Sequence, residues 1–203
     1  MKTIAKLVKD WETKNAKNAA KASGISMMAL SLAACGGGGS APAPVVVVEA
    51  VPITSALTIW NDTVAGTTAD DVVTGARIDT VQVFNSGDSI VLGDGNDSLS
   101  ATLNAGTVTP VAMTGVENVM FTVLGDATVD FDNVSGVTSI ISRGSSATLL
   151  VDDIQEIPTS ISINNNTAVQ TFVVKDTAVS GNEDSITLNF DGVGGVVNVG
   201  GET

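Results

Sequence analysis

Carboxylates recur at nine-residue intervals within residues 65–100. In the successive segments 65–73, 74–82, 83–91 and 92–100, the sixth position is an aspartate and the eighth is an aliphatic residue. The aspartates are Asp70, Asp79, Asp88 and Asp97, and the aliphatic residues are Val72, Val81, Ile90 and Leu99. Carboxylates are among the oxygen ligands that calcium takes at about 2.3–2.6 Å. The spacing therefore predicts that this part of the chain binds calcium.

The last segment, LGDGNDSLS (92–100), has the composition of a tight turn followed by a short strand. Gly93 and Gly95 flank Asp94, and Leu99 stands between two serines. Glycine and aspartate are typical of turns, and a single aliphatic residue between polar ones indicates a half-buried strand. We therefore add Gly93, Asp94 and Gly95 to the four recurring aspartates as candidate calcium ligands.

These segments also predict a way of stacking. A six-residue turn and a three-residue strand in each segment would give a coil of about eighteen residues from two segments. Coils stack at the strand separation of about 4.8 Å, which predicts Asp70 over Asp88 at one edge and Asp79 over Asp97 at the other. We expect the ion at the second edge. The alternative is a run of ordinary turns in which the aspartates accept hydrogen bonds from backbone amides.

Composition excludes several kinds of chemistry. The chain has no His, no Tyr and a single Cys, Cys35. Disulfides within the chain, zinc sites built from His and Cys, Ser–His triads and Cys–His dyads are therefore excluded. After Cys35, three basic residues face twenty acidic ones, so the body would repel nucleic acid and anionic lipid. We expect no nucleic-acid partner.

Paired carboxylates could serve a hydrolase acting on polysaccharides. Asp152 and Asp153 are adjacent in the sequence and would point to opposite faces of a strand. Asp130 and Asp132 would share a face, but an acidic surface explains them more simply. We therefore expect a protein that is not an enzyme, with a polysaccharide-acting β-helix as the alternative.

Residues 1–34 resemble a bacterial lipoprotein signal peptide. A lysine-rich stretch precedes GISMMALSLAA (24–34), which is too short to span a bilayer. This stretch leads into LAAC (32–35), which is similar to a lipobox, and the resemblance implies a lipid on Cys35 and an outer-membrane location at the cell surface. Residues 35–60 are then the lipidated Cys and a tether, since GGGGSAPAP (36–44) has a linker composition. The alternative is an amphipathic N-terminal helix with a buried, free Cys35.

A longer repeat follows the nine-residue segments. We divide the body into a nine-residue-repeat region, 61–109, and a region of repeats of about 21 residues, 110–203. Val119, Ile140 and Ile161 recur at intervals of 21, within runs of strand-forming residues that are broken by Gly, Asn or Ser. Repeats of this length normally stack. We predict an all-β fold, a parallel β-solenoid or β-roll with short coils, with an antiparallel Greek-key sandwich as the alternative.

The order of these features resembles the RTX-type surface-layer proteins of bacteria, which carry calcium-binding nonapeptides. The resemblance covers about residues 61–190. It is carried by DTVAGTTADDVVTG (62–75), GDSIVLGDGNDSLSATL (87–103), GVENVMF (115–121) and GVTSI (136–140). It implies a calcium-stabilised β-solenoid outside the cell that assembles with its neighbours. The lipobox departs from that family, whose members usually leave the cell without an N-terminal signal.

We therefore expect a non-catalytic, lipid-anchored surface protein that serves in a coat or in adhesive contacts through a ligand that the sequence does not identify. The alternative is a truncated or degenerate relative of a longer surface-layer protein. An open end of the solenoid would expose unpaired strand edges, which predicts association between copies of the chain. The membrane partner is the bilayer that receives the lipid on Cys35.

Overall fold

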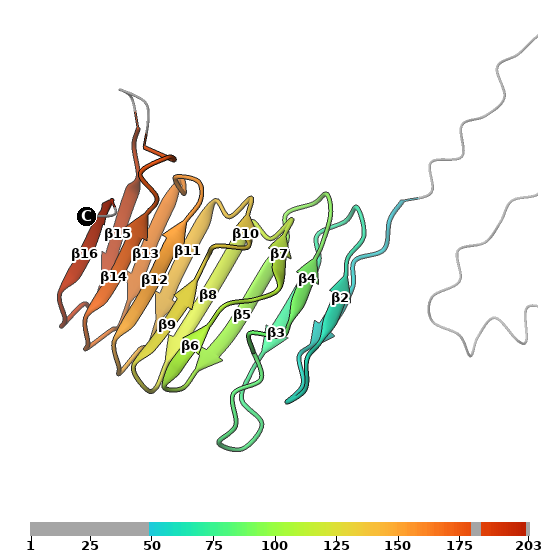
Figure 1. The fold of residues 1–203 in the computed structure, drawn as a ribbon, viewed down its shortest axis with the longest axis horizontal. Helices are drawn as coiled ribbons and strands as arrows, with labels where there is room; N and C mark the ends of the chain where they lie inside the picture. Colours follow the sequence, from blue (N-terminus) through green and yellow to red (C-terminus); the bar gives the residue numbers. More distant parts are fainter. Residues whose placement is uncertain (1–48, 180–183, 202–203) are drawn as a thin grey trace, which may run out of the picture. The chain divides into compact units, whose positions relative to one another are not determined.

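The computed structural model describes residues 49–179 and 184–201, and this part of the chain is built from β-strands alone. The predicted signal peptide and the lipidated Cys35 lie outside the described residues. Sixteen strands form three sheets, and every pairing between strands is parallel (Figure 1). The parallel β-solenoid is therefore confirmed, and the antiparallel sandwich is wrong. Among the described residues, no helix is long and apolar enough to cross a membrane.

The first sheet contains seven strands, in the order in which they follow along the chain. They are β1 (Thr54–Ala56), β3 (Val72–Gly75), β5 (Ser98–Leu103), β8 (Asn118–Val123), β11 (Ser139–Arg143), β13 (Ser160–Asn164) and β15 (Thr187–Asp191). The chain leaves this sheet after each strand and returns one position further along. It therefore adds one rung to the sheet with each coil.

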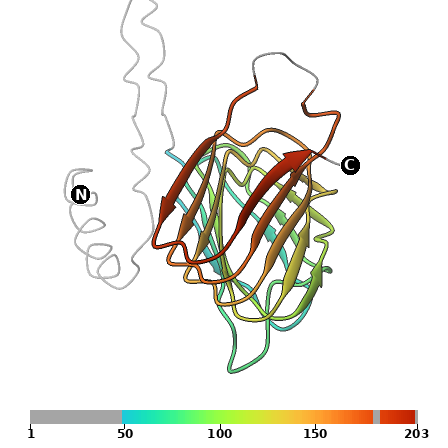
Figure 2. The ribbon, with the colours of Figure 1, turned by 90° about the vertical axis from the view of Figure 1, so that its left-hand side faces the viewer.

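Two smaller sheets complete the coils. The second sheet contains β2 (Thr63–Ala65), β4 (Ser89–Val91), β7 (Ala112–Thr114) and β10 (Val134–Ser135), and the third contains β6 (Gly106–Val108), β9 (Ala127–Asp130), β12 (Leu149–Ile154), β14 (Gln170–Val174) and β16 (Val197–Gly201). The second sheet ends at β10, so the last coils have strands on two sides only. Figure 2 shows this end, with β15 and β16 nearest the viewer.

The 21-residue repeat sets the register of the later coils. Val119 pairs with Ile140, and Ile140 pairs with Ile161, in the first sheet. All three side chains are buried, because equivalent positions of successive coils point to the same side of a strand. The predicted register of these three residues is therefore confirmed.

The first coils of the solenoid differ from one another in length. Thr54 pairs with Val72, eighteen positions later, but Val72 pairs with Ser98, which is 26 positions later. The longer coil contains an excursion, residues 76–82, which protrudes from the solenoid between β3 and β4 (Figure 1). The chain then returns to the core at Val83 and Phe84, which are both buried. A bridge between Ile78 and Val81 closes the excursion. The eighteen-residue coil predicted from the segments of residues 65–100 is therefore wrong for these segments, and an offset of eighteen occurs one coil earlier, between β1 and β3.

The apolar core of the coils is continuous across residue 110. Strand β5 alternates, with Leu99, Ala101 and Leu103 buried between partly exposed neighbours. It pairs with β8 along its whole length, so the two repeat regions share one sheet and one core. The rings of Phe84 and Phe121 stack within this core, with centroids 6.4 Å apart.

Candidate functional site

One corner of the solenoid carries a carboxylate in each of three successive coils. Asp71, Asp97 and Glu117 each precede a strand of the first sheet, and we call these three residues the acidic corner. The amide of Ile53 donates to Asp71 Oδ1 at 2.7 Å, the amide of Asp71 to Asp97 Oδ1 at 2.6 Å, and the amide of Asp97 to Glu117 Oε2 at 2.7 Å. Each side chain thus bonds the backbone of the preceding coil.

Asp97 is the least compensated carboxylate of the acidic corner. Its side chain is fully buried, and Oδ2 has no hydrogen-bond partner among the described residues. Burial raises the pKa of the Asp97 carboxyl, and the charges of Asp71, Glu117 and Asp70 raise it further, against the lowering effect of the Asp71 amide. A buried carboxylate without a counter-charge is costly. Asp97 therefore favours either a proton or a bound cation.

Asp71 is satisfied by the backbone instead. The Ile53 amide lowers the pKa of the Asp71 carboxyl, and the Thr67 amide, which donates to Oδ2 at 2.6 Å, and the Thr67 hydroxyl also lower it, against the opposing effect of burial. Hydrogen bonds to an ionised carboxylate favour the charged form. The acidic corner thus holds one carboxylate that favours its charge beside one that resists it.

A second corner, before the second sheet, repeats this arrangement with Asp62 and Asp88. The amide of Asp62 donates to Asp88 Oδ1 at 2.9 Å, and the amide of Asn85 donates to Asp88 Oδ2 at 2.7 Å. Burial raises the pKa of the Asp88 carboxyl, and the charge of Asp62 also raises it, against these two amide bonds. Asp88 is therefore paired with Asp62, not with Asp70 as the eighteen-residue coil predicted.

Asp79 lies away from both corners. It is exposed, has φ 55°, and sits at the tip of the excursion between Ile78 and Val81. The predicted stacking of Asp79 over Asp97 is therefore wrong, because the excursion replaces the turn and strand expected of residues 74–82. Val81, the aliphatic residue of that segment, is exposed rather than buried.

The other predicted ligands lie in or beside the acidic corner. Asp70 and Asp94 are exposed, and Asp70 Oδ1 accepts a bond from the Asn96 amide at 2.9 Å. Gly93 has φ 100° and Gly95 has φ 134°, and a Cβ on either would lie within 2.7 Å of a carbonyl oxygen of the preceding coil. Both glycines are therefore required by the turn itself.

In the first segment, residues 65–73, the aspartate and the aliphatic residue that match the other segments each lie one position later than the spacing predicts. Asp71, not Asp70, bonds to Asp97, and the buried aliphatic residue is Val73, whereas Val72 is partly exposed. Two consecutive aspartates and two consecutive valines occur here, so the sequence offered both frames equally. Glu117 was missed because no nine-residue segment contains it.

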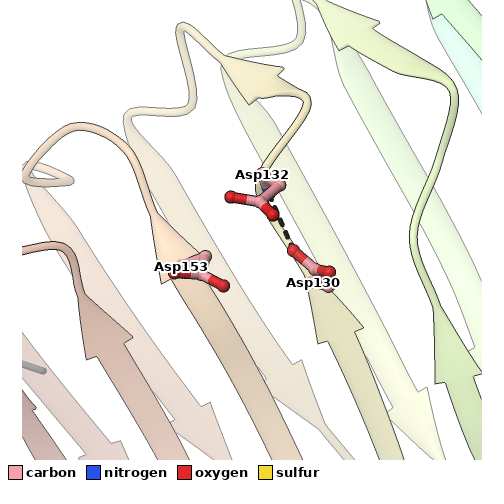
Figure 3. Close-up of side chains that lie close together, drawn as sticks. All are labelled: Asp130, Asp132 and Asp153. Atoms are coloured by element: carbon pink, nitrogen blue, oxygen red, sulfur yellow. Dashed lines mark hydrogen bonds between the residues drawn. The ribbon is translucent and has the colours of Figure 1, made fainter.

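A further acidic cluster was not anticipated as a cation site. One carboxylate oxygen from each of Asp130, Asp132 and Asp153 lies within 4.8 Å of the others (Figure 3). Asp153 occupies a bulge of β12 with φ 55°, which brings it beside the end of β9. Lys175 Nζ lies 2.5 Å from Asp132 Oδ1 and 3.7 Å from Asp153 Oδ1. The chain therefore places a cation of its own at this cluster.

The two sites fit calcium in different ways. Calcium takes six to eight oxygen ligands. In the acidic corner, backbone amides already occupy both oxygens of Asp71 and one of Asp97, which leaves Asp97 Oδ2 as a buried oxygen without a partner. In the cluster of Asp130, Asp132 and Asp153, oxygens converge, but Lys175 meets them. The acidic corner has a buried carboxylate oxygen without a partner, whereas the cluster has three carboxylate oxygens that lie close together.

The chain matches no protein family, no curated protein and no solved structure. The assignment of a function therefore depends on the sequence and on this geometry.

Proposed function

We propose that this protein is a non-catalytic, lipid-anchored component of a bacterial cell surface, whose β-solenoid is stabilised by calcium at the acidic corner. The lipid is on Cys35, and the solenoid provides a rigid acidic body for a coat or for adhesive contacts. The observation that carries the calcium part is the fully buried Asp97 carboxylate, whose Oδ2 has no partner among the described residues.

Charge balance supports a cation at this corner. The charges that act on Asp97 come from Asp71, Glu117 and Asp70, and all of them are negative. Like charges in a buried site repel and raise the cost of ionisation. A divalent cation bound at Asp97 Oδ2 would offset this repulsion and favour the charged carboxylate. The turn that holds Asp97 also carries Gly93 and Gly95, whose φ values permit the close approach of two coils.

Calcium titration of residues 36–203 tests the proposal. After treatment with chelator, the melting temperature is measured as calcium is raised to the millimolar range typical of extracellular modules, with magnesium in parallel. We expect a rise with calcium that magnesium does not reproduce. Asp97→Asn should abolish the response, because it removes the uncompensated charge.

Asp79→Ala is the matched control, since Asp79 is an exposed aspartate from the same repeat region but lies in the excursion. It should leave the calcium response unchanged. A folded wild-type protein that ignores calcium would reduce the corner aspartates to acceptors for backbone amides.

The cluster of Asp130, Asp132 and Asp153 is the second candidate position for the ion, because its oxygens converge. Asp153→Asn distinguishes the two sites. A calcium response that is lost in Asp153→Asn but kept in Asp97→Asn assigns the ion to the cluster. Lys175→Met should then strengthen calcium binding, because the competing ammonium group lies 2.5 Å from Asp132 Oδ1.

Surface location and assembly belong to the same proposal. Mass spectrometry of the protein from cells that process lipoproteins tests for a lipid on Cys35, and protease treatment of intact cells tests exposure. Leu188 and Phe190 pair with Ile161 and Ile163, yet both are exposed on the outermost strand β15. Contact between copies through this strand is expected. A protein that stays monomeric at high concentration with calcium would remove that part of the proposal.

A further inference from the structure

The first coil carries exposed apolar side chains at the end of the solenoid that follows Cys35 in the chain. Its strand β1 and these side chains fall within the range 35–60 that was predicted as tether. The exposed fractions are 70% for Val51, 46% for Ile59 and 73% for Trp60. All three precede β2, and β1 and β2 are the outermost strands of their sheets at this end. Among the described residues, no strand covers this side of the first coil.

We propose that the first coil rests on the bilayer, with Trp60, Ile59 and Val51 at the interface between lipid and water. This inference rests on the lipid anchor at Cys35 and specifies which part of the solenoid meets the membrane. Tryptophan favours this interface because its ring has an apolar body and a polar N–H group. Isoleucine and valine supply additional apolar area beside it.

Chain length supports this choice of partner. Fourteen peptide steps separate Cys35 from Glu49, where the described part begins, so the first coil lies at most about 50 Å from the lipid anchor. A short tether keeps the local concentration of the linked group in the millimolar range. A weak contact made by three side chains is then sufficient, although the same contact would not hold an untethered protein on a membrane.

The net charge of the protein determines which kind of lipid surface the first coil can contact. The body after Cys35 has twenty acidic residues and three basic ones, so it is repelled by an anionic surface. In the first coil, residues 49–65, the acids are Glu49 and Asp62, and the Asp62 carboxylate accepts bonds from the amide and hydroxyl of Thr58. The contact is therefore apolar, and it suits a zwitterionic lipid surface.

The opposite end of the solenoid supplies a matched control. Phe190 on β15 is 54% exposed, so this end is also apolar. Strands β1 and β15 are the two outermost strands of a seven-stranded sheet, and six strand separations place them about 29 Å apart. Only the end that follows Cys35 in the chain is expected to meet lipid.

Tryptophan fluorescence tests this arrangement in the processed full chain. Trp11 lies in the predicted signal peptide, so Trp60 is the only tryptophan after Cys35. The lipidated protein is reconstituted into phosphatidylcholine vesicles that carry brominated acyl chains, which quench fluorophores at the membrane. We expect Trp60 emission to shift to shorter wavelength and to lose most of its intensity. Ile59→Asp should restore much of that intensity while leaving the circular dichroism unchanged.

The control moves the fluorophore to the far end, in the double variant Trp60→Phe/Phe190→Trp. This variant should stay unquenched on the same vesicles. If it does not fold, Val196→Trp in the Trp60→Phe background replaces it, since Val196 is 59% exposed. Equal quenching at both ends would overturn the inference, because the solenoid would then lie along the membrane.

Three further outcomes separate this inference from the proposed function. A Cys35 without lipid overturns both the anchor and the contact. A lipidated protein that floats with the vesicles but keeps full Trp60 emission overturns the contact and leaves the anchor standing. Trp60 emission that shifts with protein concentration in the absence of vesicles shows that a second copy covers the first coil, which also overturns the contact.

Discussion

Replacing Gly115 by alanine tests whether close stacking of the coils determines stability. Gly115 has φ 64°, and a Cβ there would lie 2.6 Å from both the nitrogen and the oxygen of Gly93 in the preceding coil. Gly144 has φ 62° in a similar turn, but a Cβ there would meet nothing within 4 Å. The two sites share a backbone conformation and differ in the space around it.

The expected magnitude follows from this difference. Alanine in the left-handed region costs about 1–2 kcal/mol at either site, and the effect of losing glycine from the unfolded chain is also shared. At Gly115 the methyl group must in addition push two backbones apart, and overpacking of this kind costs about 1–3 kcal/mol. Gly115→Ala should therefore lower the free energy of unfolding by about 1–3 kcal/mol more than Gly144→Ala.

Urea titration and thermal melting measure this difference. For a domain of this size, 1 kcal/mol corresponds to about 2–4 °C in melting temperature, so Gly115→Ala should melt about 2–12 °C below Gly144→Ala. Both variants are compared with calcium held at one concentration, because a bound ion would shift both curves. Equal melting temperatures would refute the reasoning, since the backbone contact between Gly93 and Gly115 would then have no measurable cost when it is disturbed.

Three further predictions follow from the core and the corners. In a urea titration, Phe121→Ala should lower the free energy of unfolding by about 3–5 kcal/mol, because Phe121 is fully buried. The control Leu124→Ala, at a site that is 42% exposed, should change the free energy of unfolding by less than about 0.5 kcal/mol. Asn166→Ala removes the acceptor of the buried Ser145 amide, which donates to Asn166 Oδ1 at 2.8 Å, and should cost about 1–3 kcal/mol together with faster hydrogen exchange at that amide. Without calcium, the folded protein holds the Asp97 proton more tightly than the unfolded chain does, because folding raises the pKa of Asp97 above 3.8. The stability that this proton contributes is therefore present below pH 3.8 and is lost as the pH rises through the folded pKa. Wild-type stability should therefore fall relative to Asp97→Asn as the pH rises toward neutrality. The lowered pKa of Asp71 predicts the opposite trend, in which wild-type stability falls relative to Asp71→Asn as the pH drops below 3.8. Melting curves across this pH range that show no opposite trends would contradict both assignments.

The sequence predicted those parts of the fold that depend on regular spacing. Val119, Ile140 and Ile161 recur every 21 residues, and they align as buried neighbours on β8, β11 and β13. Leu99 and Ile90 were expected to point inward, and both are buried. In a strand, side-chain direction alternates with a period of two, so a repeated pattern of polar and apolar residues assigns the inward side where the frame is right and the expected strand forms. Val72, in a frame one position early, and Val81, in the excursion, are exposed.

Coil length in the first part of the solenoid could not be predicted in this way. Residues 74–82 match the nine-residue pattern in composition, but residues 76–82 form an excursion, and the coil that contains it is eight positions longer than the one before. A turn rich in polar residues can close a coil or protrude from it, because both conformations satisfy its backbone groups. The choice depends on whether Val81 can reach the core, and the structure leaves it exposed.

The candidate site was predicted only in part, because its turn is a local feature whereas its neighbours depend on coil length. Asp97, Gly93 and Gly95 were identified correctly as members of one turn, since glycine at positive φ and aspartate at the end of a turn are local features. The partners of Asp97 come from other coils, and their identity depends on coil length. Asp71 replaced Asp79 as its neighbour, and Glu117 joined from the next coil.

The sequence by itself determined that this chain forms strands, which side chains of the 21-residue repeat point inward, and that residues 93–97 form a tight turn. Tertiary structure decided which turns meet. The cluster of Asp130, Asp132 and Asp153 illustrates this, because it exists only where a bulge in β12 brings Asp153 beside the end of β9. Local propensities act within a few residues, whereas contacts between coils depend on the sum of all residues in the intervening turn, including any excursion.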